Sequence, residues 1–209
     1  MRKDIKFIYL DVGGVVVFDF SKNDEKWVSL MDSLGVSAAE RGVFKDIYSR
    51  YEPEMCAGRK TSGDFLEELG KNIQISVQKD HDLIGEFVNR FERNKSIADF
   101  IEDISDTFKF GLLTNMFPGM FERIKEGNLL PDIDWQVIVD SSVVGVEKPE
   151  EGIYSFAQES IEATPESILF VDNVEENVLA AQNIGWSAIL YDPLDVRGSN
   201  TRIEEFLQQ

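Results

Sequence analysis

Three apolar segments of this 209-residue chain each lead into polar side chains with chemical potential. Apolar runs that end in this way are typical of buried strands, and the carboxyl ends of parallel strands meet at one edge of a sheet. Two carboxylates beside a backbone carbonyl suit Mg²⁺, a cation that prefers oxygen ligands. The pattern predicts a metal-dependent site, although an aspartate in a turn is also an ordinary structural residue. The polar residues are Asp11, Thr114-Asn115 and Asp172, which follow residues 7–10, 108–113 and 168–171.

One lysine and the charge of the chain constrain what such a site binds. The formal net charge is −18, which repels nucleic-acid phosphates, so we expect no nucleic-acid partner. An anionic substrate must therefore meet positive charge from a metal, a lysine or helix N-termini. Lys148 lies between the third and fourth predicted strands, just before a predicted helix, and is such a lysine. Taken alone, a lysine at this position is more often a solvated surface residue.

The chain has one histidine, His81, and one cysteine, Cys56. A histidine-rich or cysteine-rich metal site and an intrachain disulfide are therefore excluded, and a Ser-His-Asp triad would need His81 as its base. No apolar segment of helix length follows Met1, which predicts neither a signal peptide nor a membrane span. We expect a cytoplasmic protein with no membrane association, and we predict no protein partner.

The elements that must position the polar residues alternate along the second half of the chain. Alternating strand and helix patterns predict an α/β protein with a Rossmann-like, doubly wound parallel sheet, to which the first strand also belongs. The later strands are expected at residues 108–113, 135–139, 168–171 and 187–190.

Residues 21–93 carry a different pattern, with apolar residues at helical spacing, capping boxes at Ser21–Asp24 and Ser37–Glu40, and a helix start at Thr61–Asp64. This block interrupts the chain between the first and second strands of the sheet, so we interpret it as an insertion. The predicted domains are a core of residues 1–17 and 96–209 and a helical cap of residues 18–95.

In this order, the motifs resemble the four motifs of the haloacid dehalogenase-like (HAD) hydrolases. The helical insert resembles the C1 cap of that superfamily, and the resemblance covers nearly the whole chain. The opening motif and the stretch from Lys148 to Tyr154 are most similar to a subgroup that includes sugar-phosphate phosphatases and the phosphatase domain of soluble epoxide hydrolase. The motifs are Asp11-x-Gly-Gly-Val, Thr114-Asn115, Lys148-Pro149 and Asp172-Asn173-x-x-Glu176-Asn177.

The resemblance implies a Mg²⁺-dependent phosphomonoester hydrolase that acts on a small phosphorylated metabolite, such as a sugar phosphate, through an aspartyl-phosphate intermediate. It makes Asp11 the nucleophile, and a carboxylate that attacks phosphorus splits one hard step into two. It also implies that Mg²⁺ is held by Asp11, the backbone carbonyl of Gly13 and Asp172. The other implied roles are catalytic positive charge (Lys148), phosphoryl binding (Thr114, Asn115 and Lys148) and support of the metal shell (Asn173 and Glu176).

One position departs from the pattern of these phosphatases. A second aspartate usually follows the nucleophile by two residues, where it protonates the leaving group and then activates water, but here that residue is Gly13. General acid–base help is typically worth about 10²–10⁴-fold. Three outcomes therefore stay open: slow hydrolysis, replacement by another residue, of which Asp19 is the nearest candidate, or loss of hydrolysis. Restoring the side chain by Gly13→Asp is expected to leave activity unchanged or to raise it.

Two other functions also stay open. One is a non-catalytic binder of a phosphorylated ligand, and the other is a dehalogenase-type carbon–halogen hydrolase, which the presence of Asp172 disfavours. Substrate choice is expected to lie in the cap. Arg59 and Lys60, in a loop between cap helices, would suit an anionic group, although loop cations are more often solvated.

Overall fold

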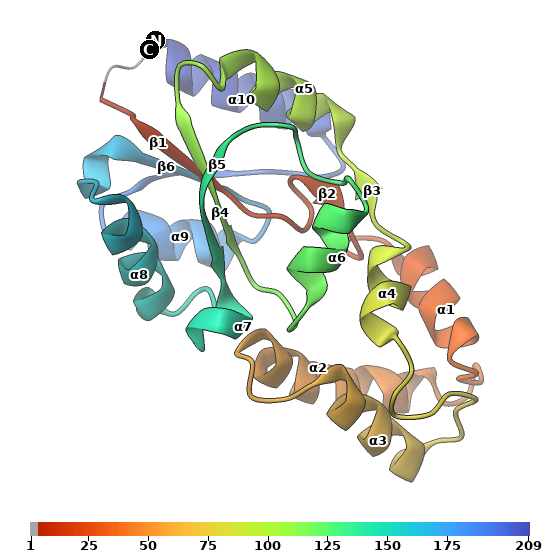
Figure 1. The fold of residues 1–209 in the computed structure, drawn as a ribbon. Coiled ribbons are helices and arrows are strands. Elements are labelled where there is room, and N and C mark those ends of the chain that lie inside the picture. Colours follow the sequence, from red (N-terminus) through yellow and green to blue (C-terminus); the bar gives the residue numbers. More distant parts are fainter. Residues whose placement is uncertain (1–3) are drawn as a thin grey trace.

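A five-stranded parallel sheet forms the centre of the computed structural model, which describes residues 4–209 (Figure 1). Each neighbouring pair of its strands is parallel, and the spatial order is β5-β4-β1-β6-β7. The chain fills one side of β1 first and then the other, so the topology switches beside β1. The predicted Rossmann-like sheet is confirmed. Its strands are β1 (Phe7–Leu10), β4 (Lys109–Thr114), β5 (Trp135–Asp140), β6 (Ile168–Asp172) and β7 (Ser187–Leu190).

Alternate residues of β1 pack into two separate apolar clusters, one on each face of the sheet. Phe7 and Tyr9 pack on the face covered by α8 (Glu151–Ile161) and α9 (Glu175–Asn183). Ile8 and Leu10 belong to the other cluster, which three helices beside the sheet share with the helical lobe described below. Burial on both faces explains why the strand is almost entirely apolar up to its last residue. The three helices are α5 (Lys95–Ile104), α6 (Met120–Glu126) and α10 (Val196–Gln208).

A helical lobe lies between β1 and β4 in the sequence and to one side of the sheet in space (Figure 1). The chain enters and leaves it through a two-stranded antiparallel ribbon of β2 (Val17–Phe18) and β3 (Glu92–Arg93). This ribbon lies near the predicted limits of the cap, and the division into two domains stays a prediction. The helices of the lobe are α1 (Asp24–Ser33), α2 (Arg41–Cys56), α3 (Ser62–Asn72) and α4 (Leu83–Val88).

Neither predicted capping box forms. The box at Ser37–Glu40 is wrong, because α2 begins at Arg41 and its N-cap, Glu40, makes no side-chain capping bond. The predicted helix start at Thr61–Asp64 is confirmed, since the Thr61 hydroxyl accepts the Asp64 N–H and the Asp64 carboxylate accepts the Thr61 N–H. The box at Ser21–Asp24 is wrong. Asn23 caps α1 instead, and its Oδ1 accepts the Lys26 N–H at 3.1 Å. Ser21 lies two residues before this cap, in the turn in which its backbone N–H donates to the Asp19 carboxylate at 2.9 Å.

Two short elements complete the chain between β5 and β6: α7 (Ser141–Val144), directly after β5, and a 3₁₀ turn (Pro165–Ser167) before β6. No helix within residues 4–209 combines the length and the apolar character that crossing a bilayer requires.

Candidate active site

The structure brings Asp11, Asp172 and Lys148 together at the carboxyl edge of the sheet. Asp11 follows β1, Asp172 ends β6, and the Lys148 ammonium reaches both from the loop before α8. Its Nζ lies 2.9 Å from Oδ1 of Asp11 and 2.6 Å from Oδ2 of Asp172, and it also donates to the Leu113 carbonyl at 2.9 Å. All three charged residues are buried. Charges so enclosed are stable only when they are paired and hydrogen-bonded, as they are here.

Asp172 is held on both carboxylate oxygens. Its Oδ1 accepts the Val174 N–H at 2.8 Å, and its Oδ2 accepts the side-chain amide of Asn177 at 3.1 Å as well as Lys148. The hydroxyl of Tyr154, buried beneath the sheet, donates to the Asn177 carbonyl at 3.0 Å. The orientation of Asp172 is therefore determined by its neighbours and not by solvent.

Asp11 is held on one oxygen only. Its Oδ1 accepts the Val12 N–H at 2.8 Å and the Lys148 ammonium, and within residues 4–209 no hydrogen bond reaches its Oδ2. Burial raises the pKa of Asp11 to about 7; Lys148 opposes this shift and the Asp172 charge adds to it. The structure thus presents one oxygen of a fixed carboxylate that is available for reaction.

Burial alone would lower the pKa of Lys148, but Asp11 and Asp172 together raise it above the ordinary value. The lysine is therefore charged at neutral pH. When both carboxylates are ionised, one ammonium between them leaves the group with one excess negative charge, which a bound cation would offset.

The loop that carries Lys148 is clamped by Asn115. Oδ1 of Asn115 accepts the Lys148 backbone N–H at 2.8 Å, and its amide donates to the Lys148 carbonyl at 2.9 Å. Both ends of this side chain are thus used to position the lysine. Thr114, the neighbouring residue predicted to bind a phosphoryl group, ends β4 beside β1 and is buried.

Of the two residues expected to support the metal shell, one is exposed on a helix and the other packs against a glycine in the loop after β1. Glu176 is exposed on α9. The Asn173 amide instead packs on Gly14, where an added Cβ would lie 2.2 Å from its nitrogen. Gly14 also has a φ of +72°, so both its conformation and this close contact require glycine.

The carboxylate of Asp19 lies close to the α-carbon of Gly13. An added Cβ at Gly13 would lie only 2.5 Å from Oδ2 of Asp19, whose other oxygen accepts the Ser21 N–H. Burial raises the pKa of Asp19 above its ordinary value. Asp19, named from the sequence only as the nearest carboxylate, is thus brought beside the space that a side chain at position 13 would occupy.

Sequence reasoning missed one strand end, Asp140-Ser141 after β5. The Ser141 hydroxyl donates to the Cys56 carbonyl at the end of α2 and accepts the Met116 N–H at 3.0 Å. It therefore links the helical lobe to the loop after β4. The signal was present, because an apolar strand leads into polar residues here as at the other three sites.

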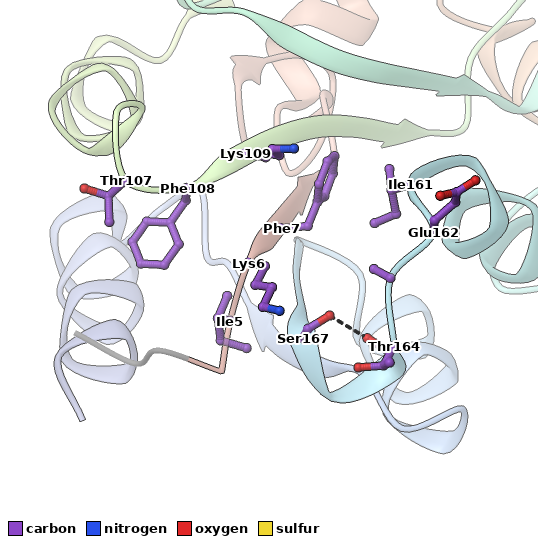
Figure 2. A pocket seen from close by; sticks show the side chains of 11 residues that line it. Ile5, Lys6, Phe7, Thr107, Phe108, Lys109, Ile161, Glu162, Thr164 and Ser167 are labelled. Atoms are coloured by element: carbon purple, nitrogen blue, oxygen red, sulfur yellow. Dashed lines mark hydrogen bonds between the residues drawn. The ribbon is translucent and has the colours of Figure 1, made fainter.

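Two cavities lie at opposite ends of the sheet. The larger, about 740 Å³, surrounds the amino ends of β1 and β4, where Lys6 and Lys109 lie among apolar side chains (Figure 2). The other, about 450 Å³, is lined by Asn115 and Lys148 on the core side and by residues of the helical lobe on the other. Lys148, which lines this second cavity, contacts Asp11, so the second cavity lies next to the carboxylate pair.

Comparison with solved structures defines the fold. A predicted HAD-like family hydrolase from Porphyromonas gingivalis shares 22% identity over 98% of both chains, with a TM-score of 0.77. The HAD family enzyme bt-2542 from Bacteroides thetaiotaomicron, solved with magnesium and inorganic phosphate, shares 16% identity over 89% of this chain and 93% of its own, with a TM-score of 0.69. L-2-haloacid dehalogenase from Xanthobacter autotrophicus, solved with chloropropionic acid covalently bound, shares 20% identity over 88% and 76%, with a TM-score of 0.62.

The chain therefore has the fold of the HAD-like hydrolases, and the resemblance predicted from its motifs is confirmed at the level of fold. No protein-family model matches the sequence.

Proposed function

We propose that this protein is a Mg²⁺-dependent phosphomonoester hydrolase acting on a small phosphorylated metabolite, with Asp11 as the nucleophile. The observation that carries the proposal is the asymmetry of Asp11: Oδ1 is fixed by Lys148 and the Val12 N–H, while Oδ2 is unpaired within residues 4–209. A fixed carboxylate with one available oxygen is suited to attack phosphorus, which forms an aspartyl-phosphate and expels the alcohol. The magnesium and phosphate bound by bt-2542, which shares the fold, support the same chemistry here.

The donor set fits magnesium. Asp11 and Asp172 are hard oxygen donors that one ammonium already holds close together, and their combined charge exceeds that of Lys148. With the Gly13 carbonyl they would supply few protein ligands, as Mg²⁺ prefers, because it retains several waters. Bound there, the ion supplies positive charge that offsets repulsion between carboxylate and phosphate.

The other residues have supporting roles in this proposal. Lys148 holds the Asp11 carboxylate in place and adds positive charge for the incoming phosphoryl group, while Asn115 fixes the lysine loop. The Thr114 hydroxyl, at the end of β4, would donate to a phosphoryl oxygen. Asp19, above Gly13, protonates the leaving oxygen and later takes a proton from the attacking water.

Phosphate release from a panel of phosphomonoesters, with Mg²⁺ or with EDTA, tests the proposal. We expect hydrolysis by the wild type only with Mg²⁺, and loss of at least about 10³-fold in Asp11→Asn, whose amide does not form a stable acyl-phosphate. Asp24→Asn, at an exposed position in the first turn of α1, is the matched control and should keep full activity. Equal activity of wild type and Asp11→Asn would overturn the nucleophile assignment. Chloride release from 2-chloropropionate in EDTA would favour the dehalogenase alternative.

A further inference from the structure

The 450 Å³ cavity beside Lys148 is the space that the leaving group of a substrate held at Asp11 would occupy. Lys148 lines this cavity and also contacts Asp11, so the cavity lies next to the carboxylate that would receive the phosphoryl group. This step rests on the proposed function. The walls of the cavity then indicate which leaving groups are accepted.

One part of the wall is aromatic. The rings pack edge to face, with centroids 4.7 Å apart for Phe20 and Trp27, 4.8 Å for Trp27 and Tyr48, and 5.0 Å for Phe20 and Phe87. Such mutual packing restricts ring rotation and keeps ring faces and edges in fixed positions. We refer to this cavity as the aromatic pocket, and its aromatic lining is Phe20, Trp27, Tyr48, Phe87, Phe91 and Phe117.

The charged part of the wall is acidic. Asp19, Glu52 and Glu147 line the aromatic pocket, and within residues 4–209 its only basic lining residue is Lys148. That lysine is already paired with both Asp11 and Asp172, so it does not neutralise the other carboxylates.

The basic loop that would suit an anionic substrate lies outside the pocket. Arg59 is exposed and pairs with Glu54 at 2.9 Å, and neither Arg59 nor Lys60 contributes to the lining. The walls therefore offer a second anionic group on the substrate no basic side chain to pair with.

The carboxylates are arranged around the pocket and do not converge on one point. Within residues 4–209 no group of three or more His, Cys, Asp or Glu side chains is placed to hold a metal ion. The carboxylates also act on the thiol of Cys56 in the same pocket: burial raises its pKa well above the usual range, and the charges of Glu52 and Glu147 raise it further. Carboxylates that surround a pocket without converging on one point suit an organic cation, whose positive charge is spread over a larger volume than that of a metal ion.

We propose that the aromatic pocket selects phosphomonoesters whose leaving group carries an organic cation, an amine or a quaternary ammonium, with the cation between the aromatic rings and the Glu52 and Glu147 carboxylates. Aromatic faces attract such cations through their quadrupole, and carboxylates at the rim add a long-range attraction. A dianionic phosphate at one end and a cation at the other would match the two halves of the site.

Three substrates of similar size test the charge preference of the Mg²⁺-loaded enzyme. Phosphocholine carries the cation, 3,3-dimethylbutyl phosphate has the same shape without charge, and phosphoglycolate carries a second anion. We expect kcat/KM for phosphocholine to exceed that for the neutral isostere by about tenfold or more, with phosphoglycolate slowest. Equal rates for phosphocholine and its isostere, or faster hydrolysis of phosphoglycolate, would overturn the inference and leave the proposed phosphatase function standing.

Variants identify the carboxylates responsible. Glu52→Gln and Glu147→Gln should each reduce the preference for phosphocholine over its isostere severalfold, mainly through KM. Glu54→Gln is the matched control, because Glu54 lies on the same helix as Glu52, pairs with Arg59 and does not line the pocket. A preference unchanged in both pocket variants, or reduced equally by Glu54→Gln, would contradict the assignment.

The single cysteine gives a readout that does not depend on catalysis. Cys56 lines the aromatic pocket, so its labelling by a cationic and by an anionic methanethiosulfonate compares the access of the two charges. We expect the cationic reagent to react at least about tenfold faster, and Glu52→Gln to narrow this ratio. Equal labelling rates for the two reagents would contradict the proposed preference of the pocket for cations, even if phosphatase activity were found. A large ratio without hydrolysis of any ester would support the pocket but not the proposed phosphatase.

Discussion

The carboxylate of Asp19 lies over Gly13, with Oδ2 2.5 Å from the point at which a Cβ on Gly13 would stand. The two residues are six positions apart, and the segment that passes through β2 brings Asp19 back beside Gly13. The side chain that the motif lacks at position 13 thus has a spatial counterpart from position 19. This relationship changes the expectation for the most obvious variant.

Gly13→Asp should lower activity and stability, in contrast to the unchanged or higher activity expected from the sequence. A new side chain must displace the Asp19 carboxylate, which Ser21 holds, and it brings two carboxylates into one buried space. The double variant Gly13→Asp/Asp19→Ala removes the conflict and should regain activity. Phosphate release by the four members of this cycle measures the coupling, and additive effects would show that the two sites are independent.

Asp19→Asn should reduce kcat by about 10²–10⁴-fold for substrates with poor leaving groups. Aryl phosphates, whose leaving groups need little protonation, should lose far less in the first step. Comparing kcat for an alkyl and an aryl phosphate in wild type and variant is the measurement. The same loss for both would assign Asp19 a structural role instead.

The sheet and its central site were predictable from local sequence because they depend on alternation and on polar strand ends. A parallel sheet brings the ends of β1, β4 and β6 together whatever the loops do, so Asp11, Thr114 and Asp172 had to converge. Lys148 was identified because it occupies the position of the lysine in the order of the HAD motifs. The strand pattern alone did not require a lysine there.

The aromatic pocket was not predictable in the same way. Glu52 lies in the middle of a helix whose local pattern gives no sign of function, and it meets Glu147 only through the packing of the lobe on the core. The position of Asp19 depends on turn geometry, where Ser21 donates to the carboxylate and does not cap α1. Contacts of this kind arise from tertiary structure and have no periodic signature.

Lys148→Met should destabilise the metal-free protein by about 3–5 kcal/mol, because Asp11 and Asp172 would then face each other buried and uncompensated. Mg²⁺ should recover part of this loss by replacing the missing positive charge, and it should stabilise the variant more than the wild type. Urea unfolding of wild type and variant, with Mg²⁺ and with EDTA, measures the loss of stability in the variant and the part that Mg²⁺ recovers. Lys109→Met, at the exposed start of β4, is the control. No added benefit of Mg²⁺ in the variant would contradict metal binding between the carboxylates.

Asp11 should make the metal-free protein less stable as pH rises from about 4 to about 7. Its pKa is raised from 3.8 to about 7 by burial, so over this range the folded state holds a proton that the unfolded state has lost. Stability linked to such a group is present below the unfolded pKa and falls as pH rises, by at most about 1.4 kcal/mol per pH unit. Unfolding of wild type and Asp11→Asn in EDTA isolates this contribution, because other carboxylates titrate in both proteins. If the free energies of unfolding of the two proteins change with pH in parallel, this contribution of Asp11 is excluded.

Ser141→Ala should loosen the contact between the helical lobe and the core. The hydroxyl of Ser141 is the donor to the Cys56 carbonyl and the acceptor of the Met116 N–H, and all three residues are buried. Leaving both backbone groups unsatisfied costs about 1–3 kcal/mol each if water does not enter. Because Cys56 and Met116 both line the aromatic pocket, we expect faster Cys56 labelling and a higher KM at nearly unchanged kcat.

Ser160→Ala removes a hydroxyl on α8 that also donates to a backbone carbonyl but lies exposed and away from the site, so it should change none of these values. A fall in kcat alone, with labelling and KM unchanged, would show that Ser141 acts on the chemistry and not on the position of the lobe.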